Sequence, residues 1–538
     1  MNKILAAAGV LLWTGAALAS NDPTRIWSNP AVPSREALDR LNLDIAWAVY
    51  VPMDGKRDGF ASIQLDHNQV IAQTRSGLIA VLDAANGGRT LWRSRPGRAY
   101  EAVLPPAINS WGVYVNDSGG VYGLDRATGQ LQWRYELRVA LSAPLSVDEQ
   151  QIYIENVEAR LIAARLPAPP KPAAPPPTAN PGTPAGTGTD QTPALPSPGA
   201  TLSIEDVRPL IAFDYDTGKR VETKAVLSKA AVFLAIPDGS YLAVPKKGDE
   251  HLDNKSLYDY SGDSRFSAPP GHTDTMAYLS TSDSHLYAVV IDSGEIQWRY
   301  FPGRPIMSRP VAVDVTEGGK ADKDLYITAL EKGMARLDRQ TGLPIWKIGH
   351  GDNNPEADRF MAVNPKFVYA ADDRGNMLIL DRKNGAVLSR YDVRDYVFPI
   401  SNAESDRIYL AANNGLIVCL HDKAYPQALS YRVKSLEERA KELADKLARP
   451  ISDAGGEMMT LAEYVDKIKK TYGVEMFISD PAFTELMLPP PEKQMIQTPK
   501  ADSQPLGDVI KSVLDQAKAE YIQREDEDTL IIKPAKMK

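Results

Sequence analysis

The chain has 538 residues, a length that favours more than one domain. Hydrophobic residues make up 43% of it and charged residues 24%, which is the composition of a globular protein. The 69 acidic and 61 basic residues give a net charge of -8, which disfavours a surface whose main task is to bind nucleic-acid phosphates. The single cysteine, Cys419, excludes an intramolecular disulfide.

The N-terminus has the pattern of a secretory signal peptide. Lys3 supplies a positive start, an apolar run extends from Ile4 to Leu12, and a small-x-small cleavage site ends at Ala19. The apolar run is short for an anchor helix, so we expect residues 1–19 to be removed on export. We predict a periplasmic or other extracytoplasmic envelope location without a lipid anchor, because no cysteine follows the cleavage site.

Residues 20–44 are predicted to be an irregular lead-in with a short helix. A recurring motif begins after it and continues to residue 432. In its clearest copy, Asp125 ends one strand, Thr128 and Gly129 close a turn, and Trp133 lies in the next strand. Asp can bond the turn backbone and Gly can adopt the positive φ that the turn needs. Copies lie about 41 residues apart, the spacing of four-stranded propeller blades.

The motif copies predict an all-β propeller with eight blades. The residues expected to form the blade turns are Asp83, Asp125, Gly129, Asp214, Gly218, Asp338, Gly342, Asp381 and Gly385. Third strands are expected to end at the aspartates of this set, and weaker copies near Val244, Val290 and Cys419 complete the count.

One blade is expected to be interrupted. A candidate third strand at residues 160–165 and another near residues 210–214 flank a run rich in Pro, Ala, Thr and Gly, over residues 167–203. We interpret both as one blade, because nine blades would exceed the usual range. The insertion cannot bury enough apolar surface to fold, so we expect an extended loop.

The ring is predicted to close through its own N-terminus. The strand at residues 45–51, which contains Trp47, can complete the last blade as its outer strand, since residues 425–433 supply a poor one. Such an overlap of both ends would also remove unpaired strand edges.

The hydrophobic period becomes helical after residue 432. Residues 433–457 are predicted to be a helix and linker, and residues 458–538 a small α+β domain. In this domain Thr460 is expected to cap a helix that Gly473 ends. A strand, a second helix over residues 506–517 and a final hairpin follow.

The blade motif resembles the PQQ-like propeller repeat, in which a tryptophan after the glycine turn docks between neighbouring blades. The tryptophans that match this position are Trp92, Trp133, Trp298 and Trp346. The superfamily has a quinoprotein dehydrogenase branch and a non-catalytic branch typified by BamB, the outer-membrane assembly factor. The C-terminal domain, over residues 458–535, resembles the short N-terminal domain of secretins and TonB-dependent receptors, which implies protein contacts in the periplasm.

The resemblance to the dehydrogenase branch does not extend to its chemistry. That branch typically has a vicinal cysteine pair and a calcium ion, whereas this chain has one cysteine. The acidic segments Asp314–Asp324 and Asp352–Asp358 lack the alternating oxygen ligands and central glycine of a calcium loop. No histidine pair has a zinc-ligand spacing. We therefore expect no catalytic residue, no cofactor and no metal site.

The sequence favours an exported, non-enzymatic propeller scaffold that binds other cell-envelope proteins, for example in a peripheral outer-membrane complex. We expect no nucleic-acid partner and no transmembrane segment in the mature chain. Two alternatives stay open: a degenerate quinoprotein oxidoreductase and a binder of cell-wall polysaccharide. The identity of the partner and the propeller face that binds it are also open.

Overall fold

The computed structural model describes residues 30–101, 103–167, 210–246, 255–317, 320–331, 333–347, 357–431, 443–453, 455–478, 494–523 and 529–534. The chain divides into two compact units, Met1–Arg432 and Val433–Lys538. The predicted signal peptide, nearly all of the Pro-rich insertion and the start of the helix after residue 432 lie outside the described residues.

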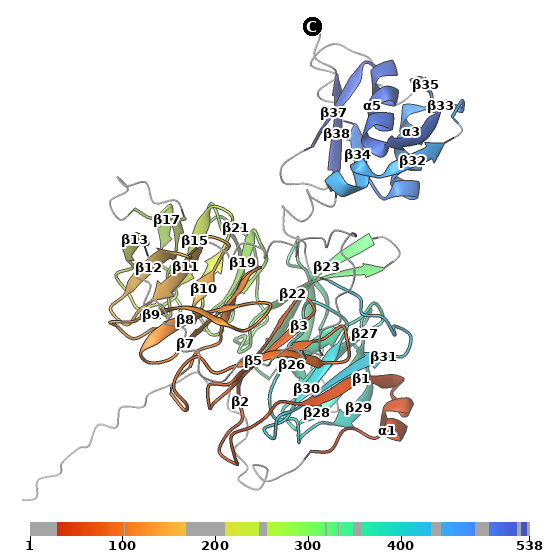
Figure 1. The fold of residues 1–538 in the computed structure, drawn as a ribbon. Helices are drawn as coiled ribbons and strands as arrows, with labels where there is room; N and C mark the ends of the chain where they lie inside the picture. Colours follow the sequence, from red (N-terminus) through yellow and green to blue (C-terminus); the bar gives the residue numbers. More distant parts are fainter. Residues whose placement is uncertain are drawn as a thin grey trace, which may run out of the picture. The chain divides into compact units, whose positions relative to one another are not determined.

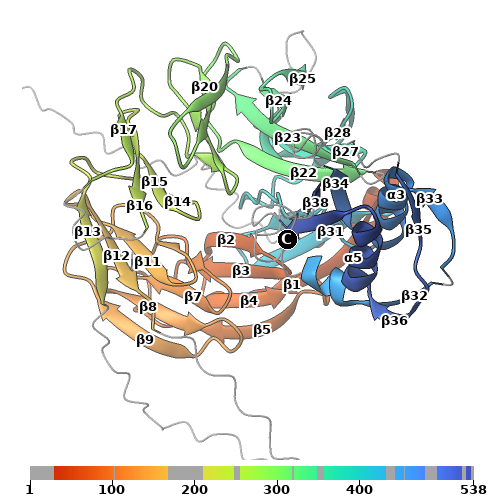
Figure 2. The ribbon, with the colours of Figure 1, turned by 90° about the horizontal axis from the view of Figure 1, so that it is seen from above.

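The first unit is an eight-bladed β-propeller, as predicted (Figures 1 and 2). Each of the first seven blades is an antiparallel sheet of four consecutive strands, and the first strand lies nearest the middle of the ring. Blades 1 and 2 contain β2 (Phe60–Asp66), β3 (Gln69–Thr74), β4 (Ile79–Asp83), β5 (Arg89–Ser94), β6 (Ala107–Ile108), β7 (Gly112–Asn116), β8 (Gly120–Asp125) and β9 (Leu131–Glu136). Blades 3 and 4 contain β10 (Ser146–Val147), β11 (Gln151–Glu155), β12 (Arg160–Arg165), β13 (Ile211–Asp216), β14 (Val226–Leu227), β15 (Ala231–Ala235), β16 (Tyr241–Pro245) and β17 (Tyr258–Tyr260).

The ring continues through blades 5 to 7 in the same order. Blade 5 contains β18 (Gly271–His272), β19 (Met276–Ser280), β20 (Leu286–Val290) and β21 (Ile296–Tyr300). Blades 6 and 7 contain β22 (Val311–Glu317), β23 (Lys320–Ala329), β24 (Gly333–Asp338), β25 (Pro344–Lys347), β26 (Ala357–Val363), β27 (Phe367–Asp372), β28 (Asn376–Asp381) and β29 (Val387–Asp392).

Blade 8 combines both ends of the propeller sequence, which confirms the predicted closure. It contains β30 (Ile408–Ala411), β31 (Leu416–Asp422) and, as its outer strand, β1 (Leu43–Tyr50). β1 pairs antiparallel with β31 along its whole length, from Leu43 opposite Asp422 to Tyr50 opposite Leu416. A short helix, α1 (Arg35–Arg40), precedes β1 and places Leu38 in the core shared by blades 7 and 8.

Blade 3 is interrupted in the way that the sequence indicated, with one correction. β12 and β13 pair although 45 residues separate their facing ends, Arg165 and Ile211 (the positions between are 166–210). The third strand of this blade is β12, so the prediction that a third strand ends at Asp214 is wrong. Asp214 lies inside the outer strand β13, opposite Ile162, and its carboxylate accepts a hydrogen bond from Arg160.

The turn after each regular third strand is organised by its aspartate. The Asp125 carboxylate accepts hydrogen bonds from the backbone N–H groups of Ala127 and Thr128, and Gly129 follows with φ +71°. Asp338 makes the equivalent bonds in blade 6. The aspartate carboxylate bonds the turn backbone and the glycine tolerates positive φ, so the two residues together determine the turn.

Neighbouring blades are joined by an indole that donates to the next turn. The Trp92 Nε1 group donates to the Arg126 carbonyl at 2.8 Å, and its ring lies against Gly129. Trp298 donates to the Arg339 carbonyl at 3.0 Å. In each pair the acceptor is the first residue after a third strand, so one contact repeats around the ring.

Three further pairs follow the same rule. Trp346 donates to the Arg382 carbonyl at 2.8 Å, and Trp47 on β1 donates to the Ala84 carbonyl at 3.0 Å. In blade 4 a tyrosine takes the place of the tryptophan, because the Tyr258 hydroxyl donates to the Ile291 carbonyl. The sequence interpretation assigned no docking contact to Trp47 or Tyr258.

Trp133 differs from the other indoles. Its Nε1 atom is buried and has no hydrogen-bond partner within the described residues. The turn that should accept this bond belongs to blade 3, where the insertion separates β12 from β13. The missing acceptor therefore follows from the interruption of that blade.

The second unit is a small α+β domain. Helix α3 (Leu461–Tyr472) begins with a capping box between Thr460 and Glu463 and ends at Gly473, whose φ is +65°. Helix α5 (Leu506–Gln516) buries one apolar face. The strands are β32 (Pro450–Asp453), β33 (Met458–Thr460), β34 (Glu475–Ile478), β35 (Met495–Gln497), β36 (Ala501–Pro505), β37 (Ala519–Gln523) and β38 (Thr529–Pro534). β38 pairs in parallel with β34 and antiparallel with β37.

We expect substitution of Trp92, whose indole has an acceptor, to destabilise the fold more than substitution of Trp133, whose indole has none among the described residues. Trp92→Phe removes a hydrogen bond and leaves the Arg126 carbonyl without its donor, whereas Trp133→Phe removes a donor that has no partner among the described residues. Trp92→Phe should therefore lower the free energy of unfolding by about 1 kcal/mol more than Trp133→Phe. Urea denaturation of both variants measures this difference, and equal losses would contradict the proposed role of the acceptor.

Candidate functional site

The direction of the strands separates two sides of the ring. Within a blade the first and third strands run one way, and the second and fourth run the other. The turn between the second and third strands therefore lies on the same side as the connection to the next blade. We call this side the loop face. The aspartate turns and their tryptophan contacts lie on the opposite side.

Three exposed apolar residues lie on the loop face of blades 5 and 6. Phe301 and Met307 belong to the connection between these blades and are 59% and 54% exposed. Leu330, which is 49% exposed, belongs to the turn between β23 and β24. We call these three residues the loop-face patch.

Backbone contacts hold the two segments of the patch together. The Leu330 N–H donates to the Pro305 carbonyl at 2.9 Å, and Ile306 forms a β-bridge with Ala329. An ion pair of 2.9 Å between Arg304 and Glu331 joins the same segments. Met307 and Leu330 are thus exposed beside backbone that these contacts fix.

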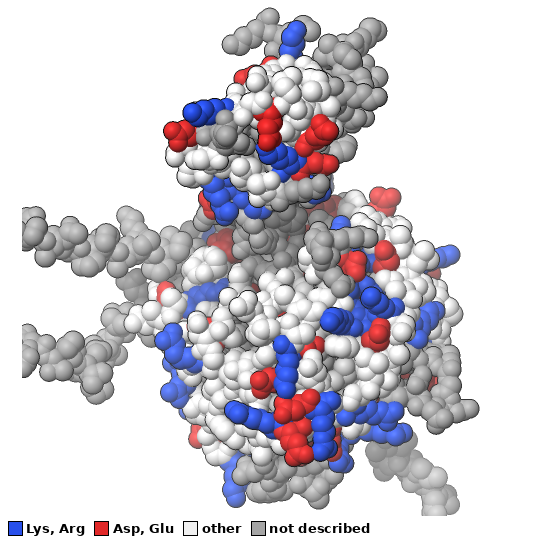
Figure 3. All heavy atoms as spheres, turned by 90° about the vertical axis from the view of Figure 1, so that its right-hand side faces the viewer, with Lys and Arg blue, Asp and Glu red and all other residues white. Residues whose placement is uncertain are grey.

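Charged residues of both signs are interspersed on the side of the molecule shown in Figure 3. Lys and Arg lie close to Asp and Glu there, with uncharged surface between them. A surface of this kind does not form a continuous phosphate-binding face, in agreement with the net charge of the chain.

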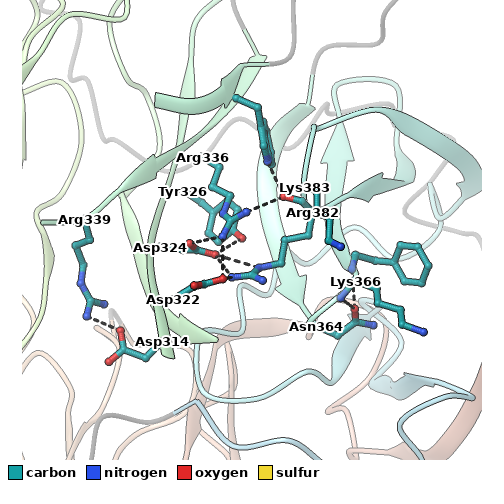
Figure 4. Close-up of polar contacts among 12 residues, drawn as sticks. Asp314, Asp322, Asp324, Tyr326, Arg336, Arg339, Asn364, Lys366, Arg382 and Lys383 are labelled. Atoms are coloured by element: carbon teal, nitrogen blue, oxygen red, sulfur yellow. Dashed lines mark hydrogen bonds and ion pairs between the residues drawn. The ribbon is translucent and has the colours of Figure 1, made fainter. Parts of the chain in front are cut away.

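The acidic segment Asp314–Asp324 is part of a hairpin between β22 and β23, and its carboxylates face arginines (Figure 4). Asp324 is 1% exposed and lies 2.8 Å from Arg336 and 2.9 Å from Arg382. Asp322 is 3.0 Å from Arg382, and Asp314 pairs with Arg339. The guanidinium groups supply the positive charge that a calcium ion would otherwise bring.

This network connects blades 6 and 7. Arg382 follows β28 of blade 7, whereas Asp324 and Arg336 lie on β23 and β24 of blade 6. The Tyr326 hydroxyl donates to Asp324 at 2.8 Å, and burial followed by the nearby carboxylate raises the pKa of Tyr326 far above its usual value. Arg336 also donates to the Arg382 carbonyl at 2.9 Å. The arrangement is a structural ion pair between blades.

The other candidate groups are spread over the molecule. Cys419 is buried, and burial raises the pKa of its thiol to about 12, so it stays protonated at neutral pH. Asp66 and Asp283 lie beside His67 and His285, respectively. Within the described ranges no three His, Cys, Asp or Glu residues gather to hold a metal ion. His251, His350 and the acidic positions 352–356 lie outside the described residues.

Apart from Asp214 on β13 and Gly218, which follows β13 in the connection to blade 4, the residues that the sequence singled out lie on the side of the ring opposite the loop-face patch. The aspartate turns and tryptophans fix the blades, whereas the patch comes from connections that the motif does not include. Little in the sequence indicates the loop-face patch. Phe301, Met307 and Leu330 are single apolar residues beside glycine, proline or charged loop residues.

Comparison with known proteins gives a partial family match. Residues 44–166 match the family model described as outer membrane protein assembly factor BamB. These residues include most of β1, blades 1 and 2, and the first three strands of blade 3. No curated protein matches the chain.

Two solved structures are similar at low sequence identity. BamB from Moraxella catarrhalis is 14% identical, with a TM-score of 0.47, over 71% of this chain and 98% of that chain. The computationally designed Ika8 protein is 12% identical, with a TM-score of 0.46, over 69% of this chain and 98% of that chain. Among the described residues, no helix is both long and apolar enough to span a bilayer.

The ion network predicts a sharp contrast between two arginines. Arg382→Met leaves the buried Asp324 carboxylate with one guanidinium partner fewer and should lower the free energy of unfolding by about 3 kcal/mol. Arg394, which pairs with Asp392 on the surface, is the matched control, and Arg394→Met should cost less than about 1 kcal/mol. Chemical denaturation measures both values. Similar losses in the free energy of unfolding would show that the buried ion pair stabilises the fold no more than the surface pair does.

Proposed function

We propose that the protein is an exported, non-enzymatic propeller scaffold that binds other proteins of the cell envelope. The observation that carries this proposal is the loop-face patch, in which Phe301, Met307 and Leu330 are exposed and backbone contacts join the segments of Met307 and Leu330. Aromatic residues and methionine are enriched where proteins meet. Burial of one such side chain in a partner contributes about 1.5–3 kcal/mol.

Two further features support the envelope as the setting. The N-terminal residues have the charge and cleavage pattern of a signal peptide. Residues 44–166 match the family model described as an outer membrane protein assembly factor. A partner in a peripheral outer-membrane complex agrees with both features.

The ion pairs of blade 6 support a non-enzymatic role. Asp314, Asp322 and Asp324 are the acidic residues that most resembled a calcium segment, and each lies beside an arginine. Of these contacts, the pairs of Arg382 with Asp322 and Asp324 join blade 7 to blade 6, and the others lie within blade 6. They serve the stability of the ring.

The C-terminal unit extends the proposed scaffold. We propose that residues 458–538 form a protein-contact module, as their resemblance to the short N-terminal domain of secretins and TonB-dependent receptors implies. The core around α3 and α5 belongs to the compact unit Val433–Lys538, which supports an independent module.

A site-specific photocrosslinker tests the scaffold. Placed at Met307 in intact cells, it should produce adducts with envelope proteins, identified by mass spectrometry. The Leu330→Asp substitution in the same chain should remove these adducts, because an uncompensated charge would enter an apolar contact. A crosslinker at Leu388, which is exposed on β29 away from the patch, is the matched control. Adducts with cytoplasmic proteins alone, or adducts that persist with Leu330→Asp, would contradict the proposal.

A further inference from the structure

Three basic residues enter the middle of the propeller from three successive blades. Lys224 lies two residues before β14, His272 ends β18, and Arg309 lies two residues before β22. Because the first strand of each blade lies nearest the middle of the ring (Figure 2), these positions approach one axis. Consecutive members of this group are 48 and 37 positions apart in the sequence, and the ring brings them together.

Two of the three residues occupy the same place in their blades. Lys224 and Arg309 each precede the first strand residue, Val226 or Val311, by two positions. In both blades the connection from the preceding blade arrives at this point. Lys224 and Arg309 therefore lie toward the loop face, at the same end of the axis.

The environment of these side chains is that of a channel wall. Lys224, His272 and Arg309 are all reached by solvent, yet burial is the main cause that lowers the pKa of each. The pKa of Lys224 falls to about 8 and that of His272 to about 3, and the charge of Arg309 contributes to both shifts. Protein thus surrounds the three groups, and they repel one another.

Glu155 and Asp66 are the acidic groups near Lys224, and their charges favour its protonated form without an ion pair to it. Lys224 and Arg309 make no hydrogen bond or ion pair with any described residue. Asp66 is already held by Arg126 at 2.5 Å. Glu155 ends β11 of the adjoining blade, is 1% exposed, and neither of its carboxyl oxygens has a hydrogen-bond partner in the described part of the chain. Burial raises the pKa of Glu155 to about 8, and the charge of the nearby Lys224 acts in the opposite direction.

We propose that the loop-face end of the ring axis binds a small anion that carries carboxylate or phosphate groups. Lys224 and Arg309 would supply charge-assisted hydrogen bonds to its oxygens. A guanidinium suits both anions because its N–H groups match two oxygens at once. The bound anion would also relieve the repulsion between the cations, which water screens weakly inside the ring. This site does not depend on the proposed protein partner.

Calorimetric titration of the full chain tests the site. Inorganic phosphate and citrate are added separately at constant ionic strength, and at least one should bind with saturation. The anion that binds more tightly identifies the preferred chemistry. Lys224→Gln and Arg309→Gln should each weaken that binding by about tenfold or more, because each removes a charged hydrogen bond. Lys229→Gln, an exposed lysine in the turn after β14, is the matched control and should leave the affinity unchanged.

Thermal unfolding separates binding from a structural role. Without added anion, Lys224→Gln and Arg309→Gln should unfold at or above the wild-type temperature, because each removes an unpaired charge from a repelling group. The anion that binds should raise the Tm of the wild type and not of these variants. The proposal is overturned if neither anion binds the wild type, if Lys229→Gln weakens binding equally, or if the two variants unfold below the wild type without anion.

Discussion

The pairing of β1 with β31 is the contact on which the propeller depends. Each blade packs against its neighbours, so the ring holds only when the last sheet is completed. Without β1, the last blade would keep β30 and β31 and present the edge of β31 to solvent. The same strand carries Trp47, whose indole donates to the Ala84 carbonyl of blade 1. One strand thus completes the eighth sheet and joins it to the first.

The repeated indole contact joins neighbouring blades on one side of the ring, the side of the aspartate turns. It reaches the first residue after a third strand at five junctions, four with tryptophan and one with Tyr258. The buried Asp324 network adds charge pairing where blade 6 meets blade 7. The loop face has different features, since the exposed apolar patch and the residues Lys224 and Arg309 lie toward it. A rigid frame with less constrained loops suits recognition.

The sequence predicted the frame better than the surfaces. Blade number and closure follow from local patterns, because an aspartate and a glycine at the end of an alternating strand favour a tight turn. Asp214 was misplaced because the segment around it repeats the motif letters after an insertion, and only pairing with β12 shows it to be an outer strand. Trp133 shares the motif, yet the turn that would accept its hydrogen bond belongs to blade 3, which the insertion interrupts. Lys224, His272 and Arg309 are distant in sequence, so no local pattern could place them on one axis.

Amide hydrogen exchange of the full chain tests the closed ring most directly. If β1 is an integral strand of blade 8, the amides of β1 that bond to β31 should exchange as slowly as the amides that join β31 to β30. Their protection should also be lost in the same cooperative transition when denaturant is added. Rapid exchange along Leu43–Tyr50, while the amides between β30 and β31 stay protected, would show that the ring is not closed by this strand and would contradict the account.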